Sequence, residues 1–188
     1  CLLNFTPTMQ SDQELILQFQ KSIKREETFT QLVKKHQAKV YHQIKRMVND
    51  HDDADDIAQM VWIKIWNKLD GFKMESEFST WLFRIAYNET LNFIAKQKRQ
   101  GSNTSSTDIL DYENTASHTD APKSSEIQIK LDQGIKQLPE KQQFVFMLRY
   151  FEELNYEKIA SITGTTVGGA KANYHQAIKK LEEFLKKS

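Results

Sequence analysis

Four aspartates crowd one short stretch of the chain, DDADDIAQMVWIKIW at residues 52–66, just before a run of bulky apolar residues. Clustered carboxylates can hold metal ions for phosphoryl transfer, but such sites need carboxylates that converge from separate elements, whereas neighbours on one helix diverge around its axis. The sequence also has no calcium-loop pattern, no His-Glu-x-x-His pair and no paired cysteines. We therefore expect no metal, no cofactor, no catalytic residue and no small-molecule substrate, so the chain is not predicted to be an enzyme.

The same aspartates suit the start of a helix. Asp52 or Asp53 fits the N-cap, and Asp55 and Asp56 would lie in the first turn, where the positive helix end stabilises negative charge. A core stripe follows at spacings of four, formed by Ile57, Val61, Ile65 and Leu69. A second side of the helix carries Asp56, Gln59, Trp62, Ile63 and Trp66. Because a helix that is apolar on two sides must bury both, this second side is predicted to be a protein interface.

Composition limits the class of protein. The chain has 188 residues, of which 39% are hydrophobic, with a net charge of +1. Its one cysteine, Cys1, cannot form an internal disulfide, which favours a reducing compartment. No apolar run approaches the roughly 18 residues that cross a bilayer, and the opening CLLNFTP is not typical of a secretion signal. We expect a soluble, cytoplasmic protein in which residues 1–9 are a disordered or non-native segment.

A break in composition divides the chain into two domains. Residues 101–125 are rich in Ser, Thr, Asp and Asn, hold one basic and four acidic side chains, and show no helical period. These features predict a flexible acidic linker between a domain at 10–100 and a domain at 126–188. In both domains apolar residues recur three or four apart, without sustained alternation. The expected fold class is all-α: two small helical domains, with about four helices in the first and three or four in the second.

The end of the first domain offers side chains to a nucleic acid. A polar loop at 73–77 follows Gly71, and Ser79 is placed to cap the next helix. That helix ends in a basic cluster, Lys96, Lys98 and Arg99. The basic end suits backbone phosphates, and the loop suits an exposed base. A core helix with a solvated basic tail would explain the same residues without any function.

Residues 152–185 have the spacing of a helix-turn-helix. A short helix begins at about Tyr156, Gly164 permits the positive φ that the turn needs, and Thr166 caps a second helix. The second helix presents a polar side on which Asn and Gln side chains can read an adenine edge in the major groove. A solvated helix face would give the same pattern.

Three segments together resemble a bacterial RNA polymerase sigma factor of the extracytoplasmic-function (ECF) group: DDADDIAQMVWIKIW, FSTWLFRIAYN and LPEKQQFVFMLRYFEELNYEKIASITGTTVGGAKANYHQAIKKL. Their order and spacing match that family across about 25–185. The resemblance implies that the first domain binds the clamp coiled coil of core RNA polymerase and opens the minus-ten promoter element. It implies that the second domain, with its helix-turn-helix, binds the minus-thirty-five element and the polymerase flap. An anti-sigma factor, membrane-anchored in many relatives, is a further partner expected by analogy.

The resemblance sorts the candidate residues into three sets. The docking set, for polymerase, is Asp55, Asp56, Gln59, Trp62, Ile63 and Trp66. The minus-ten set is the base-capturing loop Lys73, Met74, Glu75, Ser76, Glu77, Phe78 and Ser79, followed by Trp81, Arg84, Asn88, Lys96, Lys98 and Arg99. The recognition set, for the minus-thirty-five element, is Thr166, Gly168, Lys171, Asn173, His175, Gln176 and Lys179.

The chain departs from the family pattern at several positions. Met60 stands where an acid is usual, and Gly169 and Ala170 replace a Thr-Val pair. Asn173 and Gln176 stand where basic residues are common, which leaves the minus-thirty-five sequence open. The alternative function is a free-standing helix-turn-helix transcriptional regulator. That alternative leaves the second helix face and the tryptophans of the first domain without a role.

Overall fold

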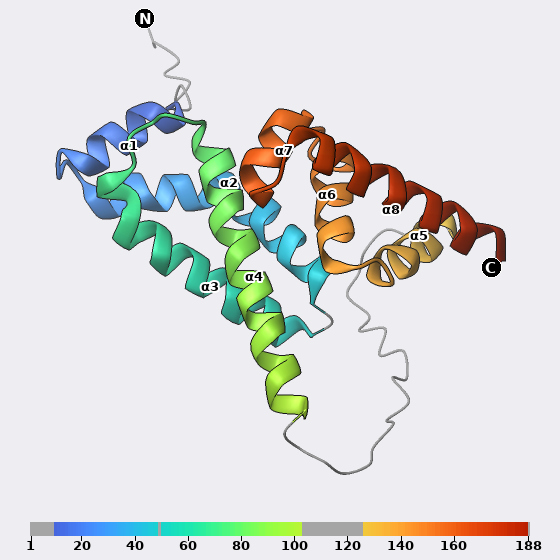
Figure 1. The fold of residues 1–188 in the computed structure, drawn as a ribbon. Helices are drawn as coiled ribbons and strands as arrows, with labels where there is room; N and C mark the ends of the chain where they lie inside the picture. Colours follow the sequence, from blue (N-terminus) through green and yellow to red (C-terminus); the bar gives the residue numbers. More distant parts are fainter. Residues whose placement is uncertain (1–9, 49, 103–125, 188) are drawn as a thin grey trace, which may run out of the picture.

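The computed structural model describes residues 10–48, 50–102 and 126–187, and every regular element in these ranges is a helix (Figure 1). The first half contains α1 (Asp12–Gln20), α2 (Arg25–Met47), α3 (His51–Lys68), the 3-10 turn η1 (Leu69–Gly71) and α4 (Phe78–Ser102). The second half contains α5 (Glu126–Lys136), α6 (Glu140–Tyr150), α7 (Tyr156–Thr163) and α8 (Val167–Lys187). The all-α class is confirmed. The segment 1–9 and residues 103–125 of the expected linker lie outside the described residues.

Helix α3 begins earlier than the sequence suggested. Asp50 is its N-cap, and the Asp50 carboxylate accepts hydrogen bonds from the backbone N–H groups of Asp52 (2.7 Å) and Asp53 (3.3 Å). The prediction that Asp52 or Asp53 caps the helix is therefore wrong, and Asp55 and Asp56 lie beyond the first turn. The core stripe is confirmed, since its four members are buried: Ile57, Val61, Ile65 and Leu69.

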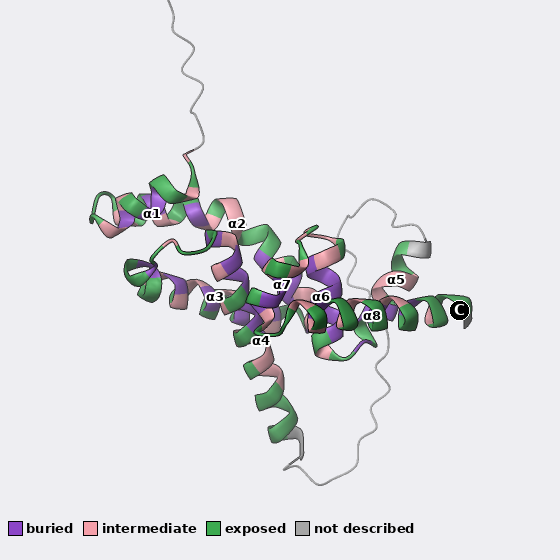
Figure 2. Cartoon of the chain, turned by 45° about the horizontal axis from the view of Figure 1, so that its top comes forward, coloured by how far each residue is buried: buried purple, intermediate pink, exposed green. Residues whose placement is uncertain are grey.

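Helix α4 also differs from its predicted limits. It begins at Phe78 rather than after a cap at Ser79, and the N–H of Trp81 donates to the carbonyl of Glu77 (3.2 Å). It continues to Ser102, two residues into the segment 101–125 that was expected to be linker. The helix runs through the middle of the molecule, between α3 and α7 (Figure 1). Figure 2 shows that its end toward Ser102 is exposed while its earlier turns are packed.

The loop between η1 and α4 is held at its start by α1 and α2. The side-chain amide of Gln20 donates to the carbonyls of Leu69 (3.0 Å) and Phe72 (2.9 Å). The guanidinium of Arg25 forms a two-pronged ion pair with Asp70, at 2.8 and 3.0 Å. Paired bonds of this kind fix orientation as well as distance. The first residues of the loop therefore have one position relative to the helices behind them.

The helix-turn-helix is confirmed in α7 and α8. Gly164 has φ 66°, and the side-chain hydroxyl of Thr166 accepts from the N–H of Gly169 (3.0 Å) at the start of α8. A side chain at Gly169 would meet this turn, because an added Cβ would lie 2.5 Å from the hydroxyl of Thr165. The glycine at this departure from the family pattern thus permits a close approach of the turn to α8.

The two halves share one buried cluster. The rings of Tyr87 in α4 and Phe144 in α6 stack with centroids 4.3 Å apart, and both side chains are buried. Figure 2 shows buried residues continuing from the first half into α6. A smaller, separate cluster joins α5, α6 and α8 through Ile135, Phe146 and Leu181.

Substitution by alanine is expected to change the free energy of unfolding differently on the two sides of α3. Ile57→Ala removes buried methyl groups and is expected to lower the free energy of unfolding by about 1–4 kcal/mol. Gln59→Ala, on the exposed side, is expected to change it by less than about 0.5 kcal/mol. Urea denaturation followed by circular dichroism measures both values. Equal losses for the two variants would contradict the division of α3 into a core side and a free side.

Candidate nucleic-acid and protein interfaces

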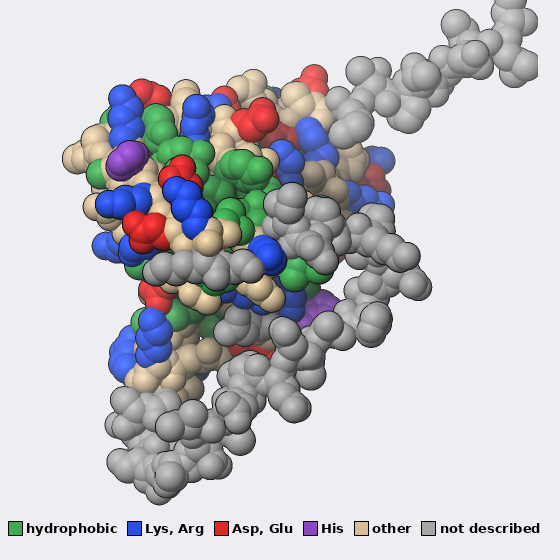
Figure 3. Space-filling view, turned by 90° about the vertical axis from the view of Figure 1, so that its right-hand side faces the viewer, with side chains coloured by type: hydrophobic (Ala, Val, Ile, Leu, Met, Phe, Trp, Pro, Cys, Tyr) green, Lys and Arg blue, Asp and Glu red, His purple; other side chains and the backbone are tan. Residues whose placement is uncertain are grey.

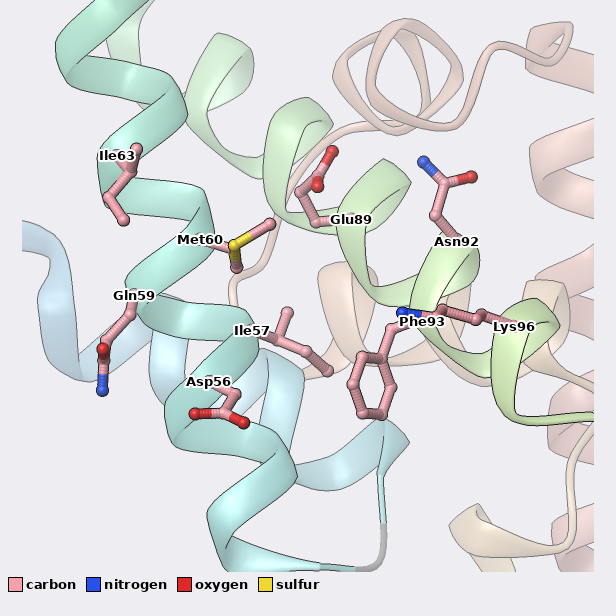
Figure 4. Close-up of a pocket in the computed structure, with 9 residues that line it drawn as sticks. All are labelled: Asp56, Ile57, Gln59, Met60, Ile63, Glu89, Asn92, Phe93 and Lys96. Atoms are coloured by element: carbon pink, nitrogen blue, oxygen red, sulfur yellow. The ribbon is translucent and has the colours of Figure 1, made fainter. Parts of the chain in front are cut away.

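A hollow lies between α3 and α4 (Figure 4). It is lined by Asp56, Ile57, Gln59, Met60, Ile63, Glu89, Asn92, Phe93 and Lys96. Its apolar lining is accessible, since Met60 is 52% and Ile63 57% exposed. Carboxylates of Asp56 and Glu89 and the ammonium of Lys96 stand around these apolar side chains. An apolar floor with a charged rim is typical of a surface that binds a helix.

A second hollow lies on the other side of the same ridge, between α2 and α3. It is lined by Val33, Gln37, Ala38, Tyr41, His42, Asp55, Ala58, Gln59, Trp62 and Ile63. Gln59 and Ile63 line both hollows and therefore form the ridge between them. The exposed members of the docking set, Asp55, Asp56, Gln59 and Ile63, thus gather around two adjacent grooves.

The two tryptophans of the docking set lie differently. Both are only partly exposed, and their rings pack edge-on against Phe29, with centroids 6.0 Å away for Trp62 and 4.9 Å for Trp66. Trp66 also meets Phe19 at 5.0 Å. These contacts place most of the Trp66 ring in the packing of α1, α2 and α3, whereas Trp62 also lines the second hollow.

The loop of the minus-ten set forms one wall of a third hollow. The opposite wall comes from α1 and α2, through Ser11, Asp12, Gln13, Ile16 and Lys35. Sequence reasoning missed these residues. The Ser11–Glu14 capping box marks the start of α1 in the sequence. The spacing of residues within α1 does not predict, however, that this end of the helix packs behind a loop some sixty residues later in the chain. Asp12 is held there by Lys35 (2.6 Å) and His36 (2.9 Å).

The remaining residues of the minus-ten set lie on different sides of α4. Arg84 and Asn88 are exposed on α4, three and seven residues after Trp81, so the three share one side of the helix. Trp81 is half-buried and its ring lies 4.7 Å from that of Phe72. Lys96 instead lines the hollow beside α3 (Figure 4).

The last two basic residues also have partners within the chain. The ammonium of Lys98 pairs with the carboxylate of Glu140 in α6. Arg99 is exposed, and its Nε donates to the carbonyl of Ala95 (3.2 Å). The basic cluster predicted at the end of the helix is thus spread around α4 rather than gathered on one side.

The recognition set is divided between two sides of α8. Gly168, Lys171, His175 and Lys179 are exposed and recur three or four apart, which places them in one stripe. Asn173 is half-buried and its amide donates to the carbonyl of Gly169 (2.8 Å). The amide oxygen of Gln176 accepts from the side chain of Gln142 in α6 (2.7 Å).

Charge on the surface is mixed. Figure 3 shows lysines and arginines interspersed with acidic and apolar side chains on the face that it presents. Among residues 10–48, 50–102 and 126–187, no group of three His, Cys, Asp or Glu side chains is arranged to hold a metal ion. In the same ranges no helix is both long and apolar enough to span a membrane.

Comparison with known proteins gives two matches to sigma-70 families. Sigma-70 region 2 matches residues 32–100, and sigma-70 region 4 matches residues 128–181. The chain is 32% identical to the RNA polymerase sigma-H factor of Pseudomonas aeruginosa, with 95% of each chain covered. It is 30% identical to the ECF RNA polymerase sigma factor SigW of Bacillus subtilis (86% of this chain and 90% of the relative). It is 32% identical to the ECF RNA polymerase sigma-E factor of Escherichia coli K12 (89% and 90%).

Solved structures give the same result. The sigma factor RpoE of Bartonella quintana, in complex with the anti-sigma factor NepR, aligns with a TM-score of 0.73 and 27% identity over 84% of this chain and 96% of that one. CnrH, in complex with the cytosolic domain of CnrY, shares the fold at a TM-score of 0.70 and 18% identity, over 95% of this chain and 99% of CnrH. With both sigma-70 regions present in order, the chain belongs to the ECF group of the sigma-70 family: it is a non-enzymatic factor that binds core RNA polymerase and recognises the minus-ten and minus-thirty-five promoter elements.

Proposed function

We propose that the two domains divide the promoter between them. Residues 10–100 dock on the polymerase clamp and open the minus-ten element, residues 126–188 bind the minus-thirty-five element and the flap, and 101–125 link them. One observation carries this assignment: region 2 and region 4 match on opposite sides of the break in composition, and the region 4 match contains the capped helix-turn-helix. Because polymerase and promoter DNA are its proposed partners, we also propose that the protein acts in the cytoplasm.

Selection from a promoter library tests this division. Core polymerase and the full-length chain are incubated with templates randomised upstream of a fixed start, and the transcribed templates are sequenced. We expect two conserved blocks separated by a fixed spacer. Specific binding of one operator by the chain alone, with no polymerase-dependent initiation, would instead identify a free-standing helix-turn-helix regulator.

We propose that the ridge of Gln59 and Ile63 seats the clamp coiled coil. The partner is a pair of helices, and the ridge has a groove on each side, both with accessible apolar side chains. Asp56 on one side and Asp55 on the other supply charge at the rim. Such charges favour encounter with a basic partner, while the apolar ridge supplies most of the affinity.

Gln59→Ala is expected to weaken association with core polymerase about tenfold or more, because the side chain lies between both grooves. Helical content should stay unchanged, since Gln59 is exposed. Fluorescence anisotropy of the labelled chain measures the affinity. The matched control is Asn67→Ala, on an exposed position of the same helix, which should bind normally. Normal binding by Gln59→Ala would mean that the docking set is assigned wrongly.

We propose that the hollow behind residues 73–79 receives a flipped base of the minus-ten element. Support comes from its position: the loop forms one wall, and α4 carries Trp81, Arg84 and Asn88 away from it along one side. Unstacking a base costs a few kcal/mol, and a hollow that contacts its edges offsets that cost. Backbone phosphates would meet Arg84 and the basic end of α4.

A loop exchange tests this role. Replacing residues 73–79 by the corresponding loop of a relative with another minus-ten preference should transfer that preference and leave the minus-thirty-five preference unchanged. The measurement is run-off transcription from templates that vary one element at a time. If the minus-ten preference stays with the rest of the chain, base capture by this loop is excluded.

We propose that Gln176 and Asn173 discriminate bases while Lys171 and Lys179 position the helix. Because Gln142 bonds to the amide oxygen of Gln176, the Gln176 amide nitrogen is the group left to donate to a base. Asn173 uses its nitrogen on Gly169, which leaves its oxygen as an acceptor. His175, exposed between the lysines, is a weaker candidate. A lysine ammonium is a flexible point charge that suits phosphates.

Replacing Gln176 by Ala should relax preference at one position of the minus-thirty-five element by about 1–3 kcal/mol. Lys179→Ala should weaken binding to all sequences and flatten the salt dependence, because one phosphate contact is lost. A panel of promoter variants with reconstituted holoenzyme separates the two effects. A uniform loss for Gln176→Ala would show that this side chain only packs against α6.

We propose an anti-sigma factor as a second protein partner. The similar RpoE of Bartonella quintana is in complex with the anti-sigma factor NepR, and that alignment covers most of this chain. In many relatives such a partner is membrane-anchored, and we extend this arrangement to the present chain. The exposed apolar ridge of α3 is a surface for which an anti-sigma factor would compete with polymerase.

A further inference from the structure

We infer that α1 and the start of α2 belong to the minus-ten site, where Gln20 and Arg25 act as positioning residues for the loop at 73–79. Both residues precede the sigma-70 region 2 match, which begins at residue 32. The inference rests on the proposed capture of a flipped base by this loop. It adds that the selection of that base depends on two side chains that act through the backbone of the loop rather than on the base.

The loop has fixed ends and an open middle. Phe72 and Phe78, at its two ends, are 8% and 4% exposed, and the centroids of their rings lie 6.1 Å apart. Between them every residue from 73 to 77 is exposed except Met74, which is half-buried. Side chains in the middle of the loop can therefore meet a base, while the position of the loop backbone is set at its ends.

Gln20 of α1 fixes the first of these ends. Its side-chain amide donates to the carbonyls of Leu69 (3.0 Å), Asp70 (3.4 Å) and Phe72 (2.9 Å). These carbonyls lie on both sides of Gly71, a residue with wide backbone freedom. An added Cβ at Gly71 would meet no atom within 4 Å, so no side chain packs against this position. The amide of Gln20 thus supplies a restraint that local packing at Gly71 does not.

Arg25 of α2 fixes the same segment from a second direction. Its guanidinium forms the two-pronged pair with Asp70 and lies 4.0 Å from the centre of the Phe19 ring. The side chains of Arg25 and Asp70 are 31% and 53% exposed, and ion pairs this exposed add little to the free energy of unfolding. Two parallel bonds do fix orientation. The pair therefore contributes mainly to the position of Asp70.

The backbone of the loop is strained close to this anchored end. Met74 has φ 56°, in the left-handed region that residues with a side chain rarely adopt. Such a conformation persists only where the surrounding structure holds it. The side chain of Met74 packs against the main buried cluster, and the anchored carbonyl of Phe72 lies two residues before it. Loss of the anchor is expected to let Met74 relax, which changes the wall beside the base.

Helix α1 also supplies the opposite wall of the hollow, through residues 11–13 and Ile16. Ile16 is fully buried, and the ion pair of Asp12 with Lys35 (2.6 Å) fastens this end of α1 to α2. The hollow has a volume of about 340 Å³, at the lower end of the roughly 300–1,000 Å³ of small-ligand sites. One helix therefore forms one wall and, through Gln20, holds the other. The spacing between the walls depends on α1.

Binding of single-stranded minus-ten DNA to reconstituted holoenzyme tests the role of Gln20. Oligonucleotides that vary one base at a time give the ratio of affinities between the best and the worst base, without a melting step. Gln20→Met keeps the length of the side chain but removes the donor. It should lower this ratio about threefold to tenfold at one position, as expected for the loss of one hydrogen bond.

The matched control is Gln18→Met, the same substitution at a half-buried position of α1, which should keep the parent ratio. An unchanged ratio in Gln20→Met, or an equal fall in both variants, would overturn the inference.

A pair of substitutions tests whether Arg25 acts through Asp70. Arg25→Lys keeps the charge but loses the paired bonds, and Asp70→Asn loses the charge that they need. Each should lower the same ratio, and the double variant should lower it no further than the stronger single variant, because all three remove one contact. Losses that add up in the double variant would contradict positioning through this pair.

Two measurements on Gln20→Met separate positioning from damage to the fold. Its circular dichroism and its affinity for core polymerase should equal those of the parent, and a fall in both would show a structural role instead. A parent chain that has no base preference on single-stranded minus-ten DNA contradicts the proposed base capture itself. A parent preference that survives in Gln20→Met and Arg25→Lys contradicts only the positioning role of these two residues.

Discussion

Helix α4 is packed on two sides at once, and this constraint organises the rest of the molecule. Against α3 it completes the hollow that we assign to polymerase, through Glu89, Phe93 and Lys96. Toward α6 and α7 it buries Tyr87 against the second domain (Figure 1). A third side, which carries Arg84 and Asn88, remains exposed, and we assign it to DNA. A single helix therefore contributes to the proposed polymerase site, to the side proposed for DNA and to the packing between the two domains.

The surface charge of the chain favours only weak binding to DNA in the absence of polymerase. Its net charge is only +1, and basic side chains alternate with acidic ones on the surface (Figure 3). Few phosphates can be neutralised by such a surface, so non-specific binding to duplex DNA is expected to be weak. Ion pairs such as Lys98–Glu140 and Lys158–Glu77 lower further the basic charge that is available to DNA.

Periodicity was sufficient to predict the helices, the core stripe of α3 and the turn at Gly164, because these depend on local spacing and backbone chemistry. The N-cap of α3 was missed because Asp50, Asp52 and Asp53 carry the same side chain, and only geometry distinguishes them. Contacts between residues that are far apart in the sequence could not be predicted, because they leave no pattern in the local spacing of residues. The packing of Trp66 on Phe19, the bond from Gln142 to Gln176 and the wall that α1 gives to the minus-ten hollow all join residues distant in sequence.

Tethered cleavage of promoter DNA tests the division of labour most directly. In a chain with Cys1→Ser, an iron chelate is attached through Ser76→Cys in the loop or Ala172→Cys on the exposed side of α8, and radical cleavage is mapped within the holoenzyme–promoter complex. Cleavage from position 76 is expected at the minus-ten element, and cleavage from position 172 at the minus-thirty-five element. Cleavage of the same element from both positions, or of the opposite elements, would contradict the assignment of the two domains.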